Sequence, residues 1–154
     1  MLFNVYTDGS CRRNGMSNAR GAWGYVILDV EFKKIIDEDC HTARGTTNQR
    51  MEMEAVIHAC SRVSLSMHTG FDEAYVYTDS AYIHNCLTQK WYEKWRVNGW
   101  MTGNKKPVAN KDLWEQLILF FEDPRFHFFK VGGHQGVKWN EYVDKMVQKA
   151  SQES

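Results

Sequence analysis

The sequence has few prolines, no long apolar run and no excess of charge of either sign. With only two prolines among 154 residues and no low-complexity stretch, no linker is apparent, and we expect a single domain over residues 1–154. Apolar runs such as 22–28 and 117–121 are far shorter than the ~20 residues of a membrane helix, so we expect no membrane association. The N-terminus lacks a basic leader, which predicts no signal peptide and a cytoplasmic protein.

Cysteine is scarce, and overall charge is balanced. The four cysteines, at positions 11, 40, 60 and 86, form no Cys-x-x-Cys pair, which argues against a zinc knuckle or redox motif and favours free thiols. The 19 basic and 19 acidic residues cancel. Any case for nucleic-acid binding must therefore rest on local charge.

The hydrophobic residues, 43% of the chain, are arranged in short periodic segments. Three β-prone segments come first and predict an antiparallel meander, and helices then alternate with two further strands. This order predicts an α/β fold with a mixed sheet and helices packed on its faces. The expected strands are 2–7, 21–29, 31–41, 73–78 and 126–131, and the expected helices are 49–64, 80–87, 91–97, 110–121 and 140–150.

Glu52 lies near the middle of the apolar stripe of its predicted helix, among Ala55, Val56 and Ala59. A carboxylate that faces a sheet is costly unless it is paired. A helix-start glutamate favoured by the helix dipole is the alternative explanation.

Asp8 and Asp79 each follow an apolar strand in a Tyr-Thr-Asp segment. If these strands are parallel neighbours, both carboxylates lie at one edge of the sheet, where ligand sites of open α/β sheets occur. Alternatively, both are turn aspartates. Asp144, on the flank of the terminal helix, would by itself be an ordinary solvated residue.

Taken together, these four acidic residues suggest a metal site. Clustered carboxylates repel one another and demand protonation or a cation. An all-oxygen set favours Mg²⁺ or Mn²⁺, and a pair of such ions ~3.5–4 Å apart is an arrangement used for phosphodiester cleavage.

Five segments, in this order, resemble type 1 ribonuclease H: Tyr-Thr-Asp-Gly-Ser-Cys (6–11), Thr-Thr-Asn-Gln-Arg-Met-Glu (46–52), Tyr-Thr-Asp-Ser (77–80), Gly-His-Gln-Gly (133–136) and Asn-Glu-x-x-Asp (140–144). The resemblance implies a five-stranded mixed sheet and hydrolysis of the RNA strand of RNA–DNA hybrids, with 5′-phosphate and 3′-hydroxyl products. It also implies two Mg²⁺ ions, which Mn²⁺ can replace, bound by Asp8, Glu52, Asp79 and Asp144.

The resemblance also implies roles for other residues. His134, in a glycine-rich loop, matches the family's histidine for proton transfer or product release; a surface turn histidine is the alternative. Cys11, Asn14, Asn48 and Gln49 match residues that contact RNA in the minor groove. Thr47 and Asn110 match residues that grip a DNA phosphate, although both also suit helix N-caps.

The segment 90–111 carries six basic residues and one acidic residue, with tryptophans between them. It resembles the basic protrusion of many bacterial members, and we expect Trp91 and Trp95 to contact substrate. A solvated hairpin that its tryptophans lock together is the alternative. The loop 12–20 departs from the family pattern, and Ala81 replaces a common glutamine. Arg13 and Arg20 are candidates to compensate.

The leading hypothesis is thus a hybrid-specific, Mg²⁺-dependent endoribonuclease that acts as a monomer and removes RNA primers or stray hybrids during DNA replication. One alternative is a hybrid-binding module that has lost the chemistry, which the intact acidic set argues against. Another is the nuclease domain of a larger polymerase.

Overall fold

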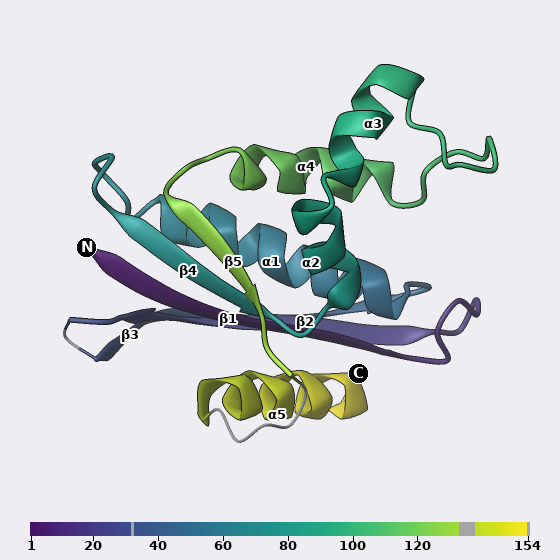
Figure 1. Ribbon diagram of the computed structural model, residues 1–154. Helices are drawn as coiled ribbons and strands as arrows, with labels where there is room; N and C mark the ends of the chain where they lie inside the picture. The colour runs from purple at the N-terminus through teal and green to yellow at the C-terminus, as the bar shows by residue number, and fades with distance from the viewer. Residues whose placement is uncertain (32, 133–137, 154) are drawn as a thin grey trace.

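The computed structural model describes residues 1–31, 33–132 and 138–153, and its centre is a five-stranded sheet (Figure 1). The strands are β1 (Leu2–Arg12), β2 (Arg20–Asp29), β3 (Lys34–Arg44), β4 (Glu73–Thr78) and β5 (Phe126–Lys130), in the order β3-β2-β1-β4-β5. The first three strands pair antiparallel, whereas β4 pairs parallel with both β1 and β5. The predicted mixed sheet with an antiparallel meander is therefore confirmed.

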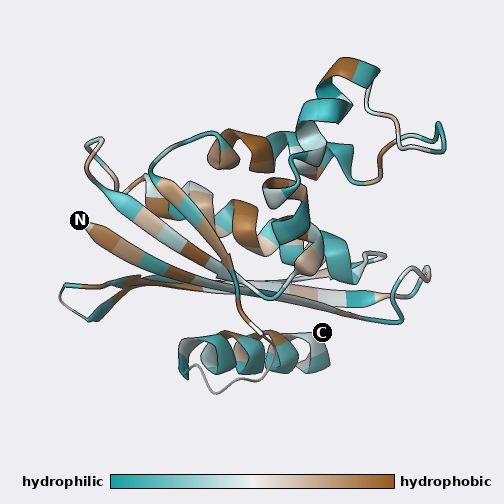
Figure 2. Cartoon of the chain, in the orientation of Figure 1, coloured by the Kyte–Doolittle hydropathy of each residue, from teal (hydrophilic) through white to brown (hydrophobic). Residues whose placement is uncertain are grey.

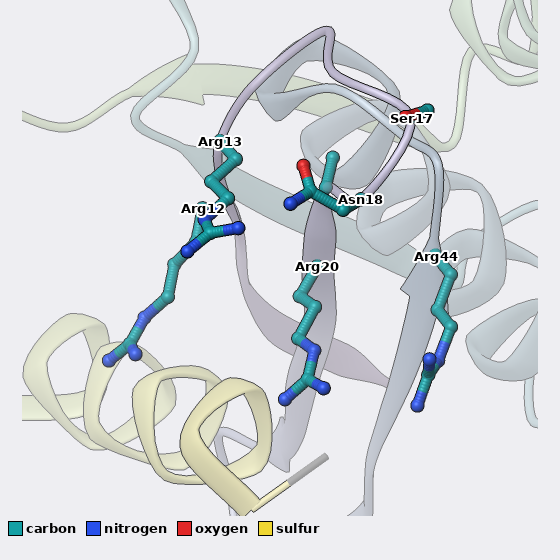
Figure 3. Close-up of a pocket in the computed structure, with 7 residues that line it drawn as sticks. Arg12, Arg13, Ser17, Asn18, Arg20 and Arg44 are labelled. Carbon is teal, nitrogen blue, oxygen red and sulfur yellow. The ribbon is translucent and has the colours of Figure 1, made fainter.

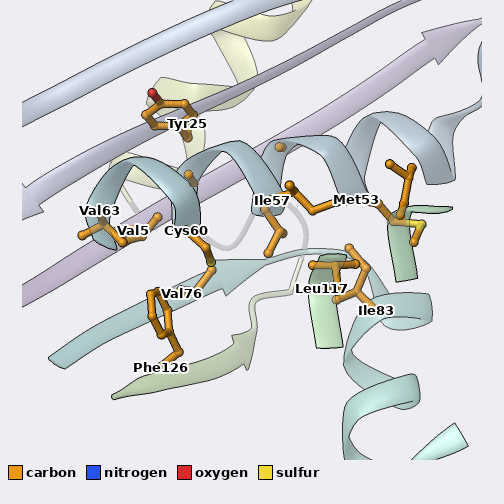
Figure 4. Close-up of a cluster of buried hydrophobic side chains, with 14 of the residues drawn as sticks. Val5, Tyr25, Met53, Ile57, Cys60, Val63, Val76, Ile83, Leu117 and Phe126 are labelled. Atoms are coloured by element: carbon orange, nitrogen blue, oxygen red, sulfur yellow. The ribbon is translucent and has the colours of Figure 1, made fainter. Parts of the chain in front are cut away.

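Helices cover both faces of the sheet, as predicted. The helices are α1 (Asn48–Ser64), α2 (Ala81–Thr88), α3 (Trp91–Asn98), α4 (Lys111–Phe121) and α5 (Lys138–Glu153). On one face, α1 and α4 enclose the larger hydrophobic core (Figure 4). On the other face, α5 buries Val143 and Val147 against β2. The outward side of α5 is hydrophilic, as a helix with one buried stripe requires (Figure 2).

Two strands differ from the predicted boundaries by three or more residues: β1 at its end, and β3 at both ends, since it ends at Arg44 instead of residue 41. The predicted first strand ends at Thr7, but β1 continues to Arg12 because β2 goes on pairing with it up to Arg12↔Arg20. The third strand begins at Lys34 instead of residue 31, and its register against β2 shifts between Ile27 and Leu28. Both differences depend on pairing between distant residues, which local sequence does not reveal.

The segment 90–111 projects from the body of the molecule as α3 and the following loop (Figure 1). Its tryptophans pack on one another: the Trp95 ring lies 6.2 Å from Trp91, 5.7 Å from Trp100 and 5.6 Å from the buried Trp114 of α4. The packing agrees with the alternative of a hairpin that its tryptophans lock together, and contact of Trp91 and Trp95 with substrate stays a prediction.

Two further sequence predictions can be compared with the described residues. Within them, no helix combines the length and the apolar character that a bilayer crossing needs. The four cysteines have free thiols, as expected.

Trp114 couples the projecting segment to the core, because its fully buried ring contacts both Trp95 and Tyr82. We expect Trp114→Ala to lower the free energy of unfolding by about 3–5 kcal/mol. Urea titration followed by circular dichroism measures this change. Leu119→Ala, on the exposed side of the same helix, is the matched control and should change stability by less than about 0.5 kcal/mol. Equal effects of the two substitutions would contradict the proposed coupling.

Candidate active site

The pairing of β1 with β4 places two aspartates at one edge of the sheet. The two strands are parallel, with Tyr6 opposite Tyr77, and their rings stack 4.8 Å apart. Thr7 Oγ1 donates a 3.0 Å hydrogen bond to the Tyr77 carbonyl. Asp8 and Asp79 each come two residues after these tyrosines, so both carboxylates lie where the parallel pairing ends. Asp8 itself is not at a strand end, because β1 continues along β2.

Glycine at position 9 allows α1 to approach this edge. A Cβ atom there would overlap the backbone of Met51 and Glu52, so only glycine permits the observed contact. The close approach brings the Glu52 side chain to the aspartates. One oxygen each of Asp8, Glu52 and Asp79 lies within 4.8 Å of the others, a group that could hold a metal ion.

Helix α5 approaches the same point from the other face of the sheet. Gly24 is opposite Asp8 on β2, and a Cβ there would lie 3.0 Å from the Val147 side chain. Asp144 precedes Val147 by one helical turn. It is near enough to Asp8 that its hydrogen bonding and its charge raise the pKa of Asp8. The structure thus brings Asp8, Glu52 and Asp79 into one cluster, with Asp144 beside Asp8.

The electrostatics of this cluster are unfavourable without a cation. Asp8 is only 7% exposed, and burial, followed by the charge of Asp79, raises the pKa of Asp8 to about 8. Burial and Asp79 likewise raise the pKa of Glu52 to about 8. Asp8 Oδ2 and Asp79 Oδ1 are buried and accept no hydrogen bond. Buried, unpartnered carboxylate oxygens are the ligands that hard divalent cations prefer, so these residues fit a metal site.

The predicted RNA-contacting residues form a linked surface beside the cluster. Asn48 Oδ1 accepts a 2.6 Å hydrogen bond from the Cys11 amide, and Asn14 Oδ1 accepts a 2.7 Å bond from the Asn48 amide. These bonds tie the end of β1, at Cys11, and the loop that follows it, at Asn14, to the first turn of α1. Asn14, Asn48 and Gln49 are exposed, and Cys11 is partly exposed.

The predicted phosphate-gripping residues are connected by a residue that the sequence analysis did not single out. Thr47 caps α1 by accepting a hydrogen bond from the Arg50 amide. Asn110 stands at the N-cap of α4, but its side chain makes no cap bond; it accepts a 3.2 Å hydrogen bond from Arg50 Nη1 instead. Arg50 also pairs with Asp112 at 2.9 Å. Its place in the Thr-Thr-Asn-Gln-Arg-Met-Glu segment was the available signal.

The remaining predicted residues contribute differently. Trp91 and Trp95 are only partly exposed, because both pack within the projecting segment. His134 and its glycine-rich loop lie outside the described residues, so its role stays a prediction from the motif.

The mixed five-stranded α/β fold and its acidic cluster define the ribonuclease H-like class of nucleases. The RNase H family model matches residues 2–152. Ribonuclease H from Syntrophomonas wolfei is 41% identical (95% of this chain and 93% of the relative covered), and that from Clostridium botulinum is 40% identical (97% and 95%). The crystal structure of LC9-RNase H1, a type 1 enzyme with the type 2 active-site motif, has a TM-score of 0.79 at 25% identity (99% and 72%).

The chain therefore belongs to the ribonuclease H family and is a nuclease.

Removing one charge from the cluster should stabilise the metal-free protein. The folded state raises the pKa of Asp8 to about 8, whereas an unfolded aspartate titrates near ~3.9. The free energy of unfolding must therefore fall as pH rises between these values. We expect Asp8→Asn in EDTA at pH 7 to raise it by at least about 1.4 kcal/mol, the equivalent of one pKa unit.

Thermal unfolding at pH 7 and pH 3.5 measures this effect, which should largely disappear at the lower pH because Asp8 is then mostly protonated in both states. Glu115→Gln, on the exposed side of α4, is the charge-matched control. An Asp8→Asn protein no more stable than this control at pH 7 would contradict the electrostatic account.

Gly9→Ala tests the approach of α1 to β1. The added methyl group must push the backbone at Met51 and Glu52 away, so we expect lower thermal stability together with weaker divalent-ion binding. Calorimetric titration with Mn²⁺ measures the second effect. Gly70→Ala, where nothing lies within 4 Å, serves as the control. Unchanged ion binding by a folded Gly9→Ala protein would show that this close approach does not position Glu52.

Proposed function

We propose that this protein is an endoribonuclease that hydrolyses the RNA strand of RNA–DNA hybrids with two Mg²⁺ ions. The observation that carries the proposal is the set of buried carboxylate oxygens without hydrogen-bond partners, at the meeting point of β1, β4 and α1. The family relatives at about 40% identity, named ribonuclease H, support the choice of substrate.

In this mechanism Asp8, Glu52, Asp79 and Asp144 would hold the metal. Bound divalent ions lower the pKa of an attacking water and stabilise charge on the phosphate and the leaving oxygen. The carboxylates orient these ions by their fixed positions on β1, α1, α5 and the segment after β4. His134 would accept or supply a proton near the leaving group, an assignment that rests on its motif alone. Mn²⁺ should substitute for Mg²⁺ because both prefer oxygen ligands.

The surface beside the cluster would recognise the substrate. Cys11, Asn14, Asn48 and Gln49 present polar groups to the minor groove, where the 2′-hydroxyl distinguishes RNA from DNA. Thr47 and Asn110, connected through Arg50, would bind a phosphate of the DNA strand. The basic segment 90–111, with Trp91 and Trp95, would contact the backbone of the duplex at a greater distance from the cleavage point.

The wider assignments are part of the same proposal. We infer a single catalytic domain over residues 1–154, monomeric and cytoplasmic. An enzyme of this kind removes RNA primers or stray hybrids during DNA replication.

The direct test is cleavage of a labelled RNA–DNA hybrid, with double-stranded RNA and double-stranded DNA as competing substrates. We expect cleavage of the hybrid alone, its loss in EDTA, and 5′-phosphate ends on the products. Glu52→Gln or Asp79→Asn should reduce kcat by at least about 10²-fold, the scale of losing one group that stabilises transition-state charge. Glu115→Gln should retain activity. A hybrid that stays intact with Mg²⁺ and with Mn²⁺, although bound tightly, would favour a binding module instead.

A further inference from the structure

Four arginines surround a cavity of about 570 Å³ at the end of the sheet formed by β1, β2 and β3 (Figure 3). The cavity is lined by Arg12, Arg13, Ser17, Asn18, Ala19, Arg20 and Arg44. None of these lining residues is acidic, so the cavity is an intensely positive spot on a chain whose net charge is zero.

Strand register aligns three of the arginines in one row. Arg12 is opposite Arg20, and Arg20 is opposite Arg44, on three adjacent strands. Their side chains extend in the same direction (Figure 3). Like charges directly opposite one another on a sheet are destabilising. An anion bound to Arg12 and Arg44, which flank Arg20, would relieve the repulsion between these charges.

The cavity is held open by the backbone around it. Within the loop that follows β1, the Met16 amide donates to the Arg13 carbonyl and the Ala19 amide donates to the Met16 carbonyl, each at 3.0 Å. The Gly45 amide donates a 2.9 Å hydrogen bond to the Ala19 carbonyl, which fastens this loop to the end of β3. No ion pair among the described residues engages Arg12, Arg13 or Arg44. At least these three guanidinium groups are thus available to a ligand.

The row lies on the same face of β1 as the active-site aspartate. Side chains alternate along a strand, so Arg12, four residues beyond Asp8, shares its face. Four residues of strand span ~13 Å. Successive phosphates of one strand advance ~3.4 Å along a duplex axis, so the row would meet the backbone within about four base pairs of the cleavage point.

We propose that the row of Arg12, Arg20 and Arg44 is a second phosphate-binding site. It would bind backbone phosphates of the nucleic-acid substrate about four base pairs from the scissile phosphate, in the direction in which β1 runs from Asp8 to Arg12. Planar guanidinium groups bind phosphate oxygens through paired hydrogen bonds. The assignment rests on the proposed hybrid-cleaving function. It also assigns a role to the loop 12–20, which departs from the family pattern, because Arg13 of this loop adds a fourth positive charge beside the row.

The test uses Arg12→Gln/Arg44→Gln, which keeps Arg20 and removes the two outer charges. Lys33→Gln/Lys34→Gln is the matched control, since it removes two charges at the opposite end of β2 and β3. Cleavage is measured on hybrids with one cleavable position, extended stepwise to either side, at several salt concentrations.

We expect the arginine variant to raise KM about tenfold with kcat nearly unchanged. It should flatten the dependence of log KM on log salt by about one unit per arginine. The parent should gain affinity when the hybrid is extended by about four base pairs on one side, and the variant should lose that gain. Its thermal stability should equal or exceed that of the control, because the repulsive row is broken. A KM and salt dependence equal to those of the control would overturn the proposal while leaving the hybrid-cleaving function intact.

If the parent neither binds nor cleaves hybrid, the proposed hybrid-cleaving function is wrong. Titration with inorganic phosphate then tests separately whether the arginine row binds phosphate. Chemical shifts of the Arg12 and Arg44 guanidinium groups report binding at the row independently of any duplex. Saturable shifts would keep the row as a phosphate site without a duplex ligand, and unchanged shifts would remove the site.

Discussion

The structure depends on one constraint: four acidic side chains must be held together in a partly dry place where their charges repel. Asp8 is almost fully buried, and its pKa is raised first by burial and then by its acidic neighbours. Burial and mutual repulsion outweigh the hydrogen bonds from the Gly9 backbone to Asp8 and from Ser80 to Glu52, and one buried oxygen each of Asp8 and Asp79 has no hydrogen-bond partner. The fold must hold the carboxylates together against their mutual repulsion. A divalent cation bound among them would replace this repulsion with attraction.

The sheet and its two covering layers meet that requirement by close packing. Gly9, the residue after Asp8, lets α1 contact β1 on one face of the sheet. Gly24, which is opposite Asp8, lets α5 contact β2 on the other face. The parallel pairing of β1 with β4 supplies Asp79. Three independent elements therefore converge on one strand position, and the substrate surface around Asn48 and Arg50 is built on the first turn of the same α1.

Much of this arrangement was predictable from sequence, because the residues with chemistry sit in short local motifs. The mixed sheet and the apolar stripe of α1 follow from periodicity, and the paired Tyr-Thr-Asp segments indicate that Asp8 and Asp79 are neighbours. The grouping of all four acidic residues rested on the resemblance to type 1 ribonuclease H. Features that depend on pairing between distant strands were missed. The extension of β1 to Arg12, the start of β3 at Lys34 and the arginine row all require the register. The hydrogen bond from Arg50 to Asn110 joins residues 60 positions apart, so the motif around Arg50 could not reveal its partner.

The most direct test of the central claim is a crystal structure of the unaltered protein with Mn²⁺ and an RNA–DNA hybrid whose scissile linkage is made non-hydrolysable, with the ions located by anomalous scattering. The account predicts two Mn²⁺ ions ~3.5–4 Å apart beside one RNA phosphate, both held among the carboxylates of the cluster. Full occupancy of the hybrid with no ion between Asp8 and Asp79, or with ions bound only elsewhere on the surface, would contradict it.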